Sequence, residues 1–308
     1  MARHDEVGVR VAVVIVTYNS ADALGTCLAS LPAGLDGVEV TEIVVADNAS
    51  RDSTCEIAKN FTELPVRVVE IGRNAGYAAG INAGIRALGS YDTVLVINPD
   101  VRVRPGAAAK LAEAFSRSNV GIAAPRLENP DGSLQPSLRR PPTVLRAWAE
   151  ALIGGNRAGR WGTLGELITD PRRYDVPGPA AWATGGVLML SAEAVRQTGQ
   201  WDETFLLYGE ETDFALRAGR LGLLTWYTPD AVFEHDGGES GTNPMLWALL
   251  TVNRTTVVRR HYGFLAWAGY FAAVVVGEGI RALAGRPTAK AALTALLNPS
   301  RRRKVLPQ

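Results

Sequence analysis

The segment Asn98–Pro99–Asp100 follows the apolar run Val94–Ile97 and is the strongest candidate for phosphate chemistry in this chain of 308 residues. The Asp100 carboxylate can bind a hard divalent cation, and such a cation neutralises a diphosphate. Asn, Pro and Asp are also common formers of exposed turns. Taken alone, the segment fits a metal and phosphate site and a solvent-exposed turn equally well.

Two more candidate residues follow short apolar segments, Asp47 and His235. A buried Asp47 carboxylate at a strand end can accept the imide N–H of a uracil or thymine ring, and the alternative is an Asx-turn that ends the strand. His235 lies between Glu234 and Asp236 and is one of three histidines. It is a candidate metal ligand, and the alternative is a structural side chain.

Glu210, Glu211 and Asp213 place three carboxylates within four positions at the start of a predicted helix. Acidic residues stabilise a helix N-terminus through the helix dipole. A carboxylate in a cleft can instead act as a general base, with a pKa that its neighbours adjust. Clustering alone does not decide between these two interpretations.

Gly76, Gly80 and Gly84 recur at every fourth residue of another predicted helix, shortly after Asn74. Glycines on one helix face permit close approach of another part of the chain. The N-terminus of such a helix also favours an anion. Tight packing and anion binding are therefore both open for this segment.

The elements that must position these residues alternate between strand and helix patterns in the first half of the chain. Strands are predicted at 11–17, 42–46, 66–71 and 93–97, and helices at 20–31, from 53, at 76–88 and at 105–117. This alternation predicts a parallel sheet covered by helices on both faces. Ligands of such sheets bind beyond the carboxyl ends of the strands, where Asp47 and Asp100 would lie.

The second half of the chain has a different pattern. Residues 136–181 are rich in Pro, Gly, Arg and Trp without clear periodicity, which predicts a long and functional loop region. A strand is predicted at 183–190, a helix at 210–221 and a short strand at 224–227.

The composition is that of a globular protein, with 47% hydrophobic and 20% charged residues, so a largely disordered chain is excluded. The net charge is +1, but seven basic and no acidic residues occur from Arg281 onwards, which indicates an anionic surface at that end. Two cysteines without metal-ligand spacing and an N-terminus without an apolar stretch indicate a reduced, cytosolic setting.

The run Phe264–Val276 is apolar or small throughout. A membrane-spanning helix needs about 20 apolar residues, and Glu278 and Arg281 interrupt this one. We expect either a helix packed on the rest of the chain or one lying in the membrane interface, which the aromatic residues and the basic run Arg301–Lys304 favour. No base-stacking motif accompanies the basic run, so no nucleic-acid partner is expected.

Taken together, these segments resemble the inverting family 2 glycosyltransferases of the GT-A fold, in order over about residues 10–240. The motifs that carry the resemblance are Val14–Ser20, Val45–Ser50, Asn74–Asn82, Asn98–Val101, Pro130–Ser133, Thr184–Gly186, Trp201–Phe205, Glu210–Asp213 and His235. The Asn-Pro-Asp segment, the Asp-Gly-Ser turn and Arg139–Pro141 resemble the rhamnosyltransferase branch in particular.

The resemblance implies an α/β fold, in which helices flank a mixed, mostly parallel sheet and amphipathic helices follow at the C-terminus. It also implies a catalytic domain over residues 1–240, with a nucleotide-binding half at about 10–125 and an acceptor-binding half at 126–240. Residues 241–308 would form a membrane-associating helical segment.

The resemblance also implies roles for individual residues. The residues implied to bind the donor are Thr17, Tyr18, Asn19, Asp47, Arg73, Asn74, Asn98 and Asp100. Those implied on the acceptor side are Trp182, Gly185, Gly186, Trp201 and Glu210, with both tryptophans stacking on a sugar. Asp100 and His235 would bind Mg²⁺ or Mn²⁺. Glu211 would be the catalytic base, but this chain has Glu-Glu where the family has Glu-Asp, so Glu210 and Asp213 stay open for that role.

The implied reaction is inverting transfer of L-rhamnose from deoxythymidine diphosphate rhamnose to a hydroxyl of a polyprenyl-diphosphate-linked glycan, in cell-wall or polysaccharide synthesis. One alternative is another sugar on the same fold, such as galactofuranose, mannose or N-acetylglucosamine. A second is a non-catalytic module that binds nucleotide sugars at the membrane. We expect a cytoplasmic protein held peripherally at the inner face of the cell membrane, and we leave a homodimer open.

Overall fold

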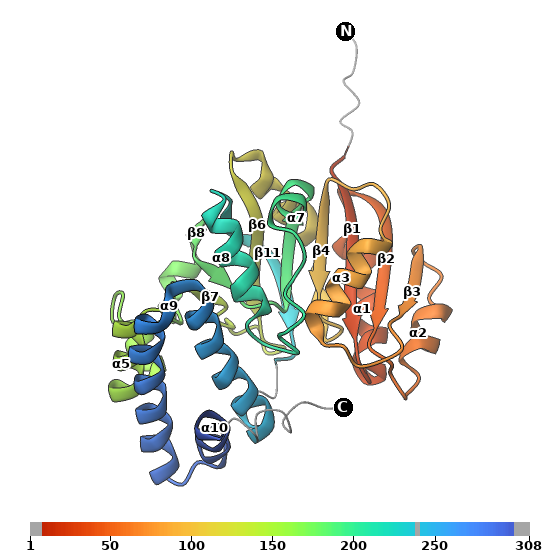
Figure 1. Ribbon diagram of the computed structural model, residues 1–308. Helices are drawn as coiled ribbons and strands as arrows, with labels where there is room; N and C mark the ends of the chain where they lie inside the picture. Colours follow the sequence, from red (N-terminus) through yellow and green to blue (C-terminus); the bar gives the residue numbers. More distant parts are fainter. Residues whose placement is uncertain (1–7, 238–240, 299–308) are drawn as a thin grey trace.

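The computed structural model describes residues 8–237 and 241–298 (Figure 1). The strands in these ranges are β1 (Arg10–Thr17), β2 (Glu39–Asp47), β3 (Val66–Glu70), β4 (Thr93–Ile97), β5 (Val101–Val103), β6 (Val120–Glu128), β7 (Leu138–Arg139), β8 (Gly178–Ala180), β9 (Trp182–Ala183), β10 (Val187–Ser191) and β11 (Leu224–His235). The helices are α1 (Ala21–Gly34), α2 (Thr54–Asn60), α3 (Tyr77–Ala87), α4 (Ala107–Ala112), α5 (Val144–Ile153), α6 (Gly155–Arg160), α7 (Ala192–Thr198), α8 (Glu210–Arg220), α9 (Pro244–Leu283) and α10 (Pro287–Leu297). Two 3₁₀ helices are η1 (Glu113–Ser116) and η2 (Pro171–Tyr174).

One large sheet forms the centre of the molecule, with the strand order β3-β2-β1-β4-β10-β6-β11-β5 and with β8 beside β11. The four strands β3, β2, β1 and β4 are parallel to one another. β10 is antiparallel to both β4 and β6, whereas β6 and β11 are parallel. The sheet is therefore mixed and mostly parallel, and the expected GT-A arrangement of strands is confirmed.

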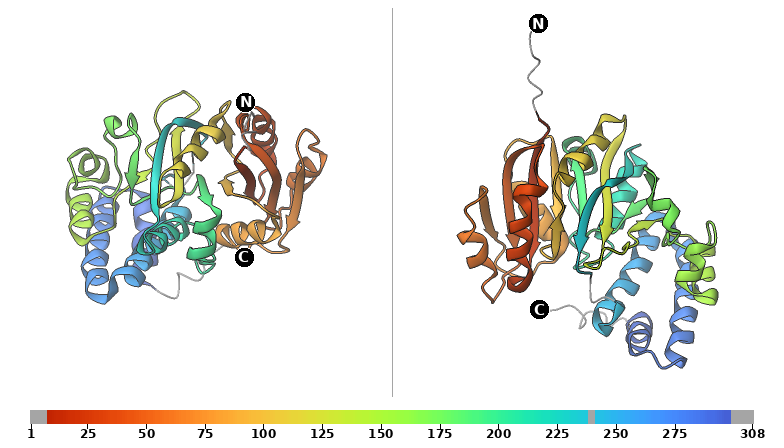
Figure 2. Two further views of the ribbon diagram at one scale, coloured as in Figure 1. Left: turned by 90° about the horizontal axis from the view of Figure 1, so that it is seen from above. Right: turned by 180° about the vertical axis from the view of Figure 1, so that it is seen from behind.

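Helices cover both faces of the sheet, as the alternating pattern predicts (Figure 2). On one face, α1, α2 and α4 pack against side chains such as Val13 and Ile15 of β1. On the other face, α3 packs against Val14 and Val16 of the same strand, and α7 and α8 continue this cluster over β10 and β11. Because successive side chains of a strand point to opposite faces, one apolar strand supplies both cores.

The glycines of α3 serve close packing. A Cβ atom at Gly80 would lie 2.4 Å from Val16 Cγ1, and one at Gly84 would lie 2.5 Å from Val14 Cγ1. Gly76 has a φ of 94°, and a Cβ there would lie 2.4 Å from the Leu206 carbonyl oxygen. The packing interpretation of this repeat is thus confirmed.

The expectation of a long loop over residues 136–181 is wrong. This segment contains α5, α6, η2 and the two short strands β7 and β8. Val144, Ala147 and Trp148 of α5 pack in one cluster with Tyr270 and Val274 of α9. The apolar spacing of α5 is helical, but prolines and glycines on either side obscure it. Its packing partner lies more than a hundred residues away in the chain.

The predicted strand at 183–190 is in fact two strands, β9 and β10, because Thr184–Gly186 interrupts it. β11 is much longer than the predicted strand at 224–227, since it continues through a register irregularity between Thr228 and Val232 to His235. This extension places His235 beside β5, where it pairs with Val101.

The helix α9 has a sharp kink at Gly263, where φ is 83°, and so forms two arms. By length and composition, α9 is the one helix in the described ranges that could cross a membrane. Its second arm packs on α5, and Glu278 in that arm is fully buried and accepts hydrogen bonds from Trp247 and Arg281. The packed helix, one of the two alternatives left open by the sequence, is thus present, whereas the basic run 301–304 lies outside the described residues.

Candidate active site

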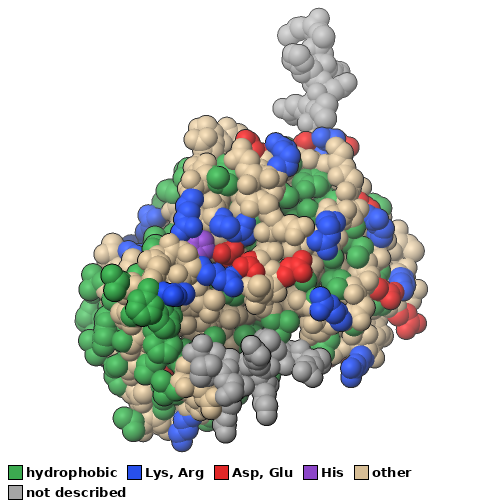
Figure 3. Space-filling model, viewed as in Figure 1, with side chains coloured by type: hydrophobic (Ala, Val, Ile, Leu, Met, Phe, Trp, Pro, Cys, Tyr) green, Lys and Arg blue, Asp and Glu red, His purple; other side chains and the backbone are tan. Residues whose placement is uncertain are grey.

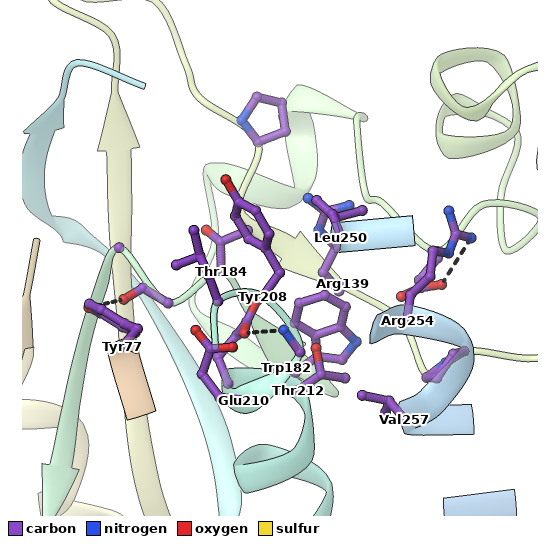
Figure 4. A pocket seen from close by; sticks show the side chains of 18 of the residues that line it. Tyr77, Arg139, Trp182, Thr184, Tyr208, Glu210, Thr212, Leu250, Arg254 and Val257 are labelled. Atoms are coloured by element: carbon purple, nitrogen blue, oxygen red, sulfur yellow. Dashed lines mark hydrogen bonds and ion pairs between the residues drawn. The ribbon is translucent and has the colours of Figure 1, made fainter. Parts of the chain in front are cut away.

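A cavity of about 430 Å³ opens where β4 ends and the turn before β10 begins (Figure 4). Its walls come from the turn after β4, from β7, β9 and the end of β11, from the loop before α8, and from the helices α3, α5, α8 and α9. The predicted site residues that line it are Asn98, Asp100, Trp182, Gly185, Gly186, Glu210, Glu211 and His235. The donor-binding residues expected from 17 to 74 and Trp201 do not line this cavity.

Asp100 and His235 face each other at one wall of the cavity. Asp100 Oδ1 and His235 Nε2 are 3.5 Å apart. Both atoms are buried, and neither has a hydrogen-bond partner within the described ranges. Burial raises the pKa of Asp100, but the attraction of His235 outweighs it and holds this pKa below its usual value. A carboxylate oxygen and an imidazole nitrogen that converge in this way suit a divalent cation.

The orientation of His235 leaves its Nε2 atom available to bind a metal. Its Nδ1 atom is 2.7 Å from Gln135 Oε1, so a hydrogen bond there places the ring proton on Nδ1 and leaves a lone pair on Nε2. No group of three His, Cys, Asp or Glu side chains that could hold a metal occurs in the described part of the chain. Asp100 and His235 could therefore hold a cation only together with ligands from a substrate.

Glu211 lies across the Gly185–Gly186 backbone from this pair. A Cβ atom at Gly185 would lie 3.3 Å from Glu211 Cβ, and one at Gly186 would lie 3.4 Å from His235 Nε2. Glu211 Oε2 accepts a hydrogen bond of 3.0 Å from the Gly209 amide. Burial raises the pKa of Glu211, which brings it closer to the range in which a base exchanges protons near neutral pH.

The two alternative bases differ in their surroundings. Asp213 binds Arg217 and His261, each at 2.8 Å, and does not line the cavity. Its burial favours the neutral acid, but these two hydrogen bonds outweigh that effect and lower the pKa of Asp213. Glu210 lines the cavity, and burial, together with the charge of Glu211, raises its pKa well above the usual value. Asp213 is therefore a structural ion-pair residue, and Glu210 is predominantly a neutral acid.

Asp47 and Thr17 meet at the ends of β2 and β1, as their register requires. Asp47 is 2% exposed and accepts hydrogen bonds from Thr17 Oγ1 at 2.8 Å, from the Ser50 amide at 2.8 Å and from Ser50 Oγ. These contacts form the turn that was the alternative to base binding. A carboxylate has about four acceptor positions, so contact with a nucleobase stays a prediction. Asn19 Oδ1 accepts a hydrogen bond of 2.8 Å from the Arg51 amide, which connects the loops that follow β1 and β2. Tyr18 is exposed.

The N-terminus of α3 is less open to an anion than the sequence suggests. The Tyr77 amide, the first of the helix, donates to the Leu206 carbonyl at 2.8 Å and is therefore unavailable to a phosphate. Asn74 Oδ1 accepts a weak bond of 3.3 Å from the Gly76 amide, and Arg73 is exposed. The phosphate-binding roles of Arg73 and Asn74 stay predictions.

The two tryptophans expected on the acceptor side have different environments. Trp182 lines the cavity, and the Arg139 guanidinium lies 5.5 Å from its ring centroid. Trp201 is 2% exposed and stacks on Phe214 with ring centroids 4.6 Å apart. Since its ring lies in the core between the sheet and α8, the expected stacking of Trp201 on a sugar is wrong.

Several cavity residues had no predicted role. Arg254 of α9 lies 3.1 Å from Glu150 and 3.9 Å from Glu166, and its Nε donates to Tyr270 at 2.8 Å. Arg139 lines the same cavity as Glu211, and its positive charge lowers the pKa of Glu211 against the effect of burial. For these cavity residues the sequence contains one signal of function, the position of Arg139 in the Arg139–Pro141 motif. Glu150 and Glu166 belong to the segment taken for a loop.

The fold and the cavity together define a glycosyltransferase of the GT-A type. The profile of Glycosyl transferase family 2 matches residues 12–164, and the chain belongs to this family. It is 32% identical over 246 residues to the N-acetylglucosaminyl-diphospho-decaprenol L-rhamnosyltransferase of Mycobacterium tuberculosis, covering 75% of this chain and 78% of the relative. The resemblance to the rhamnosyltransferase branch is thereby confirmed.

Two solved structures share the fold at low sequence identity. One is the mannosyltransferase PcManGT from Pyrobaculum calidifontis in complex with GDP-Man and Mn²⁺, with a TM-score of 0.58, 19% identity, and coverage of 94% of this chain and 75% of that one. The other is GalNAc-T7 with UDP, GalNAc and Mn²⁺, with a TM-score of 0.53 and 16% identity. The match to GalNAc-T7 covers 75% of this chain but only 44% of that one.

Proposed function

We propose that this glycosyltransferase transfers L-rhamnose, with inversion, from deoxythymidine diphosphate rhamnose to a hydroxyl of a polyprenyl-diphosphate-linked N-acetylglucosamine. The observation that carries the catalytic part is the arrangement around Gly185–Gly186. Asp100 Oδ1 and His235 Nε2 lie unpartnered on one side, and Glu211 lies on the other. The choice of sugar and acceptor rests on the similarity to the mycobacterial rhamnosyltransferase.

In this mechanism Glu211 accepts the proton of the acceptor hydroxyl. The hydroxyl oxygen attacks the anomeric carbon from the face opposite the donor diphosphate, and the bond from that carbon to the phosphate oxygen breaks. A single displacement of this kind inverts the anomeric centre. Because Gly185 and Gly186 carry no side chains, nothing from this turn fills the space beside Glu211 and His235.

Asp100 and His235 would hold Mg²⁺ or Mn²⁺, whose chemistry is to neutralise the charge of the leaving diphosphate. Gln135 keeps the His235 proton on Nδ1 and thereby keeps Nε2 available. Complexes of two proteins with this fold contain Mn²⁺, which supports a divalent cation here. Asp47, Tyr18 and Asn19 would contact the nucleoside, with Thr17 holding Asp47 in place.

A donor panel with Mn²⁺ present tests the proposed donor. We expect deoxythymidine diphosphate and its rhamnose ester to raise the melting temperature, and uridine diphosphate to leave it unchanged. Rhamnose transfer to N-acetylglucosaminyl-diphospho-lipid should follow. Stabilisation by uridine diphosphate alone would refute the rhamnose donor in favour of another sugar. A donor that binds without turnover on any acceptor would favour the non-catalytic alternative.

We further propose that α5 and α9 hold the protein on the cytoplasmic face of the membrane. Hydrophobic side chains gather over these helices at the lower left of Figure 3. Leu145 and Leu152 of α5 are 70% and 65% exposed, and Leu265 and Leu283 of α9 are 86% and 91% exposed. Exposed basic residues occur on and beside the same helices, namely Arg157, Arg160, Arg259, Arg286 and Lys290. Leucines with nearby cations suit an anionic bilayer surface.

Sedimentation with vesicles of anionic phosphatidylglycerol tests this surface. The double variant Leu265→Glu, Leu283→Glu should bind at least about tenfold more weakly, because it replaces apolar contacts by charges that the lipid repels. Leu221→Glu is the matched control, since Leu221 is 52% exposed at the end of α8. Equal binding of all three proteins would refute the surface. The homodimer stays a prediction.

A further inference from the structure

Arg139 is a cation in the cavity without a neutralising partner. Its Nε atom is buried and has no hydrogen-bond partner among the described residues. No carboxylate of the described chain lies within 4.0 Å of its guanidinium. Arg139 as a whole is half-buried, and an unpartnered buried donor such as its Nε is costly, so this group in a cavity suits a ligand that completes it.

Arg254 provides the contrast within the same cavity. Its guanidinium lies within 4.0 Å of both Glu150 and Glu166 and also donates to Tyr270. Arg254 is therefore satisfied by the protein itself. Of the two arginines that line the cavity, only Arg139 has its charge left for a substrate.

Trp182 adds a second unsatisfied donor at the same place. It is 7% exposed, it lines the cavity, and its indole Nε1 has no hydrogen-bond partner in the described ranges. Arg139 and Trp182 are held together because β7 and β9 pair at these two residues, and because the guanidinium lies 5.5 Å from the ring centroid. The two donors are thus built into one rigid two-stranded sheet.

This pair lies on the side of the base rather than on the side of the cation. The charge of Arg139 stabilises the ionised forms of Glu211 and Glu166, so that it lowers the pKa of each against the effect of burial, whereas Asp100 responds to His235. A group near the base faces the acceptor, because the base must reach the acceptor hydroxyl. Figure 4 shows Arg139 beside Trp182, between Glu210 on one side and Arg254 on the other.

We propose that Arg139 and Trp182 bind the diphosphate of the lipid-linked acceptor and thereby select acceptors that carry this anion. This inference rests on the proposed function. A guanidinium forms bidentate, charge-assisted hydrogen bonds to phosphate oxygens, and an indole N–H donates one more. Arg139 is a specificity residue in this assignment: it holds the acceptor sugar by its diphosphate while Glu211 deprotonates a hydroxyl of the same sugar.

Two acceptors that differ only in the anion test the assignment, namely N-acetylglucosaminyl-diphospho-lipid and the matching neutral N-acetylglucosaminyl alkyl glycoside. Arg139→Gln should raise the KM for the diphosphate acceptor by about tenfold or more. Its KM for the neutral acceptor and for the donor should stay within about twofold of the wild type, because Arg139 contacts neither of these substrates in this assignment. Arg139→Lys should recover part of the loss, since it keeps the charge but not the bidentate geometry.

The neighbouring Arg140 supplies the matched control. Its guanidinium donates to the Gly165 carbonyl and does not line the cavity, so Arg140→Gln should leave the preference between the two acceptors unchanged. Trp182→Phe keeps the ring and removes the N–H, and should raise the KM for the diphosphate acceptor alone, by about threefold. If Arg139→Gln does not fold, Trp182→Phe still tests the preference between the diphosphate acceptor and the neutral acceptor.

Two results would overturn the assignment. In the first, Arg139→Gln and Trp182→Phe weaken both acceptors equally, which would make the pair structural. In the second, the KM for the donor rises instead, which would assign the pair to the donor diphosphate. A wild-type chain that binds donor but transfers to neither acceptor would instead refute the proposed function itself.

Discussion

The proposed nucleotide-binding half of this glycosyltransferase (about residues 10–125) and its proposed acceptor half, defined as residues 126–240 together with α9, are built in different ways. In the first half, β3, β2, β1 and β4 are parallel, and the candidate residues follow strand ends directly. In the second half, the cavity wall comes from α5, α8 and α9 and from the small sheet of β7 and β9. Residues that meet there, such as Glu150 and Arg254, are 104 positions apart in the chain.

The two halves also differ in how their polar groups are satisfied. Asp47 accepts three hydrogen bonds within its own half. In the cavity, Glu210 Oε2, Arg139 Nε and Trp182 Nε1 are buried without partners in the described ranges. Unsatisfied buried groups cost stability, so their concentration at one place indicates a surface completed by substrate. Asp47 is therefore satisfied by its own part of the chain, whereas these three cavity groups are left for a ligand.

The largest effect should come from removing the base. Glu211→Gln is expected to lower kcat by about 10²–10⁴-fold, because the amide cannot accept the acceptor proton. Donor binding, measured by the thermal shift with deoxythymidine diphosphate, should persist. Undiminished turnover would show that Glu211 is not the base. Loss of donor binding would show that the two halves are not independent.

Arg254→Leu tests how far the acceptor half depends on its charge network. The variant leaves Glu150 and the buried Glu166 without their cation, which should cost about 3–5 kcal/mol in the free energy of unfolding. Lys59→Met in the nucleotide half removes an exposed pair with Glu70, whose side chains are 57% and 59% exposed, and should leave the free energy of unfolding nearly unchanged. Urea unfolding of both variants measures the contrast, and equal losses would contradict it.

His235→Ala should act on the cation and spare the acceptor. Removing one of two protein ligands is expected to raise the Mn²⁺ concentration for half-maximal activity by about 100-fold. Gln135→Ala should give a smaller rise, of about tenfold, because it frees the His235 proton from Nδ1 without removing the ligand. Titration of activity with Mn²⁺ measures both. An unchanged requirement in His235→Ala would exclude this pair as the metal site.

Glu210→Gln should have the smallest effect on catalysis. Because burial raises the pKa of Glu210 well above its usual value, Glu210 carries its proton when Glu211 ionises, and Gln resembles that neutral form. We expect the acid limb of the pH–kcat profile to stay in place. A shift of this limb to lower pH would mean that Glu210 is charged while Glu211 titrates.

The same substitution should change how stability depends on pH. The folded protein keeps the Glu210 proton at pH values where the unfolded chain has lost it, above the ordinary glutamate pKa of 4.5. The contribution of this group is thus full below that pH and is lost as pH rises through the folded pKa. Glu210→Gln should therefore raise the melting temperature more at pH 8 than at pH 5. An equal change at both pH values would contradict the buried, protonated state.

Much of the nucleotide half could be predicted from the sequence. The strands at 11–17 and 93–97 are found within a residue of their predicted ends, because long β-branched runs have a strong period and few alternatives. Asp47 and Asp100 follow such strands, and parallel pairing brings strand ends to one edge of a sheet. The similarity in motif order likewise identified the family.

The acceptor half was decided by the tertiary structure. From the sequence, Trp182 and Trp201 were expected to have the same role. Only the packing shows that Trp201 stacks on Phe214 and that Trp182 lines the cavity. Asp213 and Glu211 were both candidates for the base on sequence alone. They differ in the structure because Arg217 and His261 pair with Asp213 and not with Glu211. Burial and ion pairing depend on contacts between distant segments. Local periodicity carries no information about such contacts.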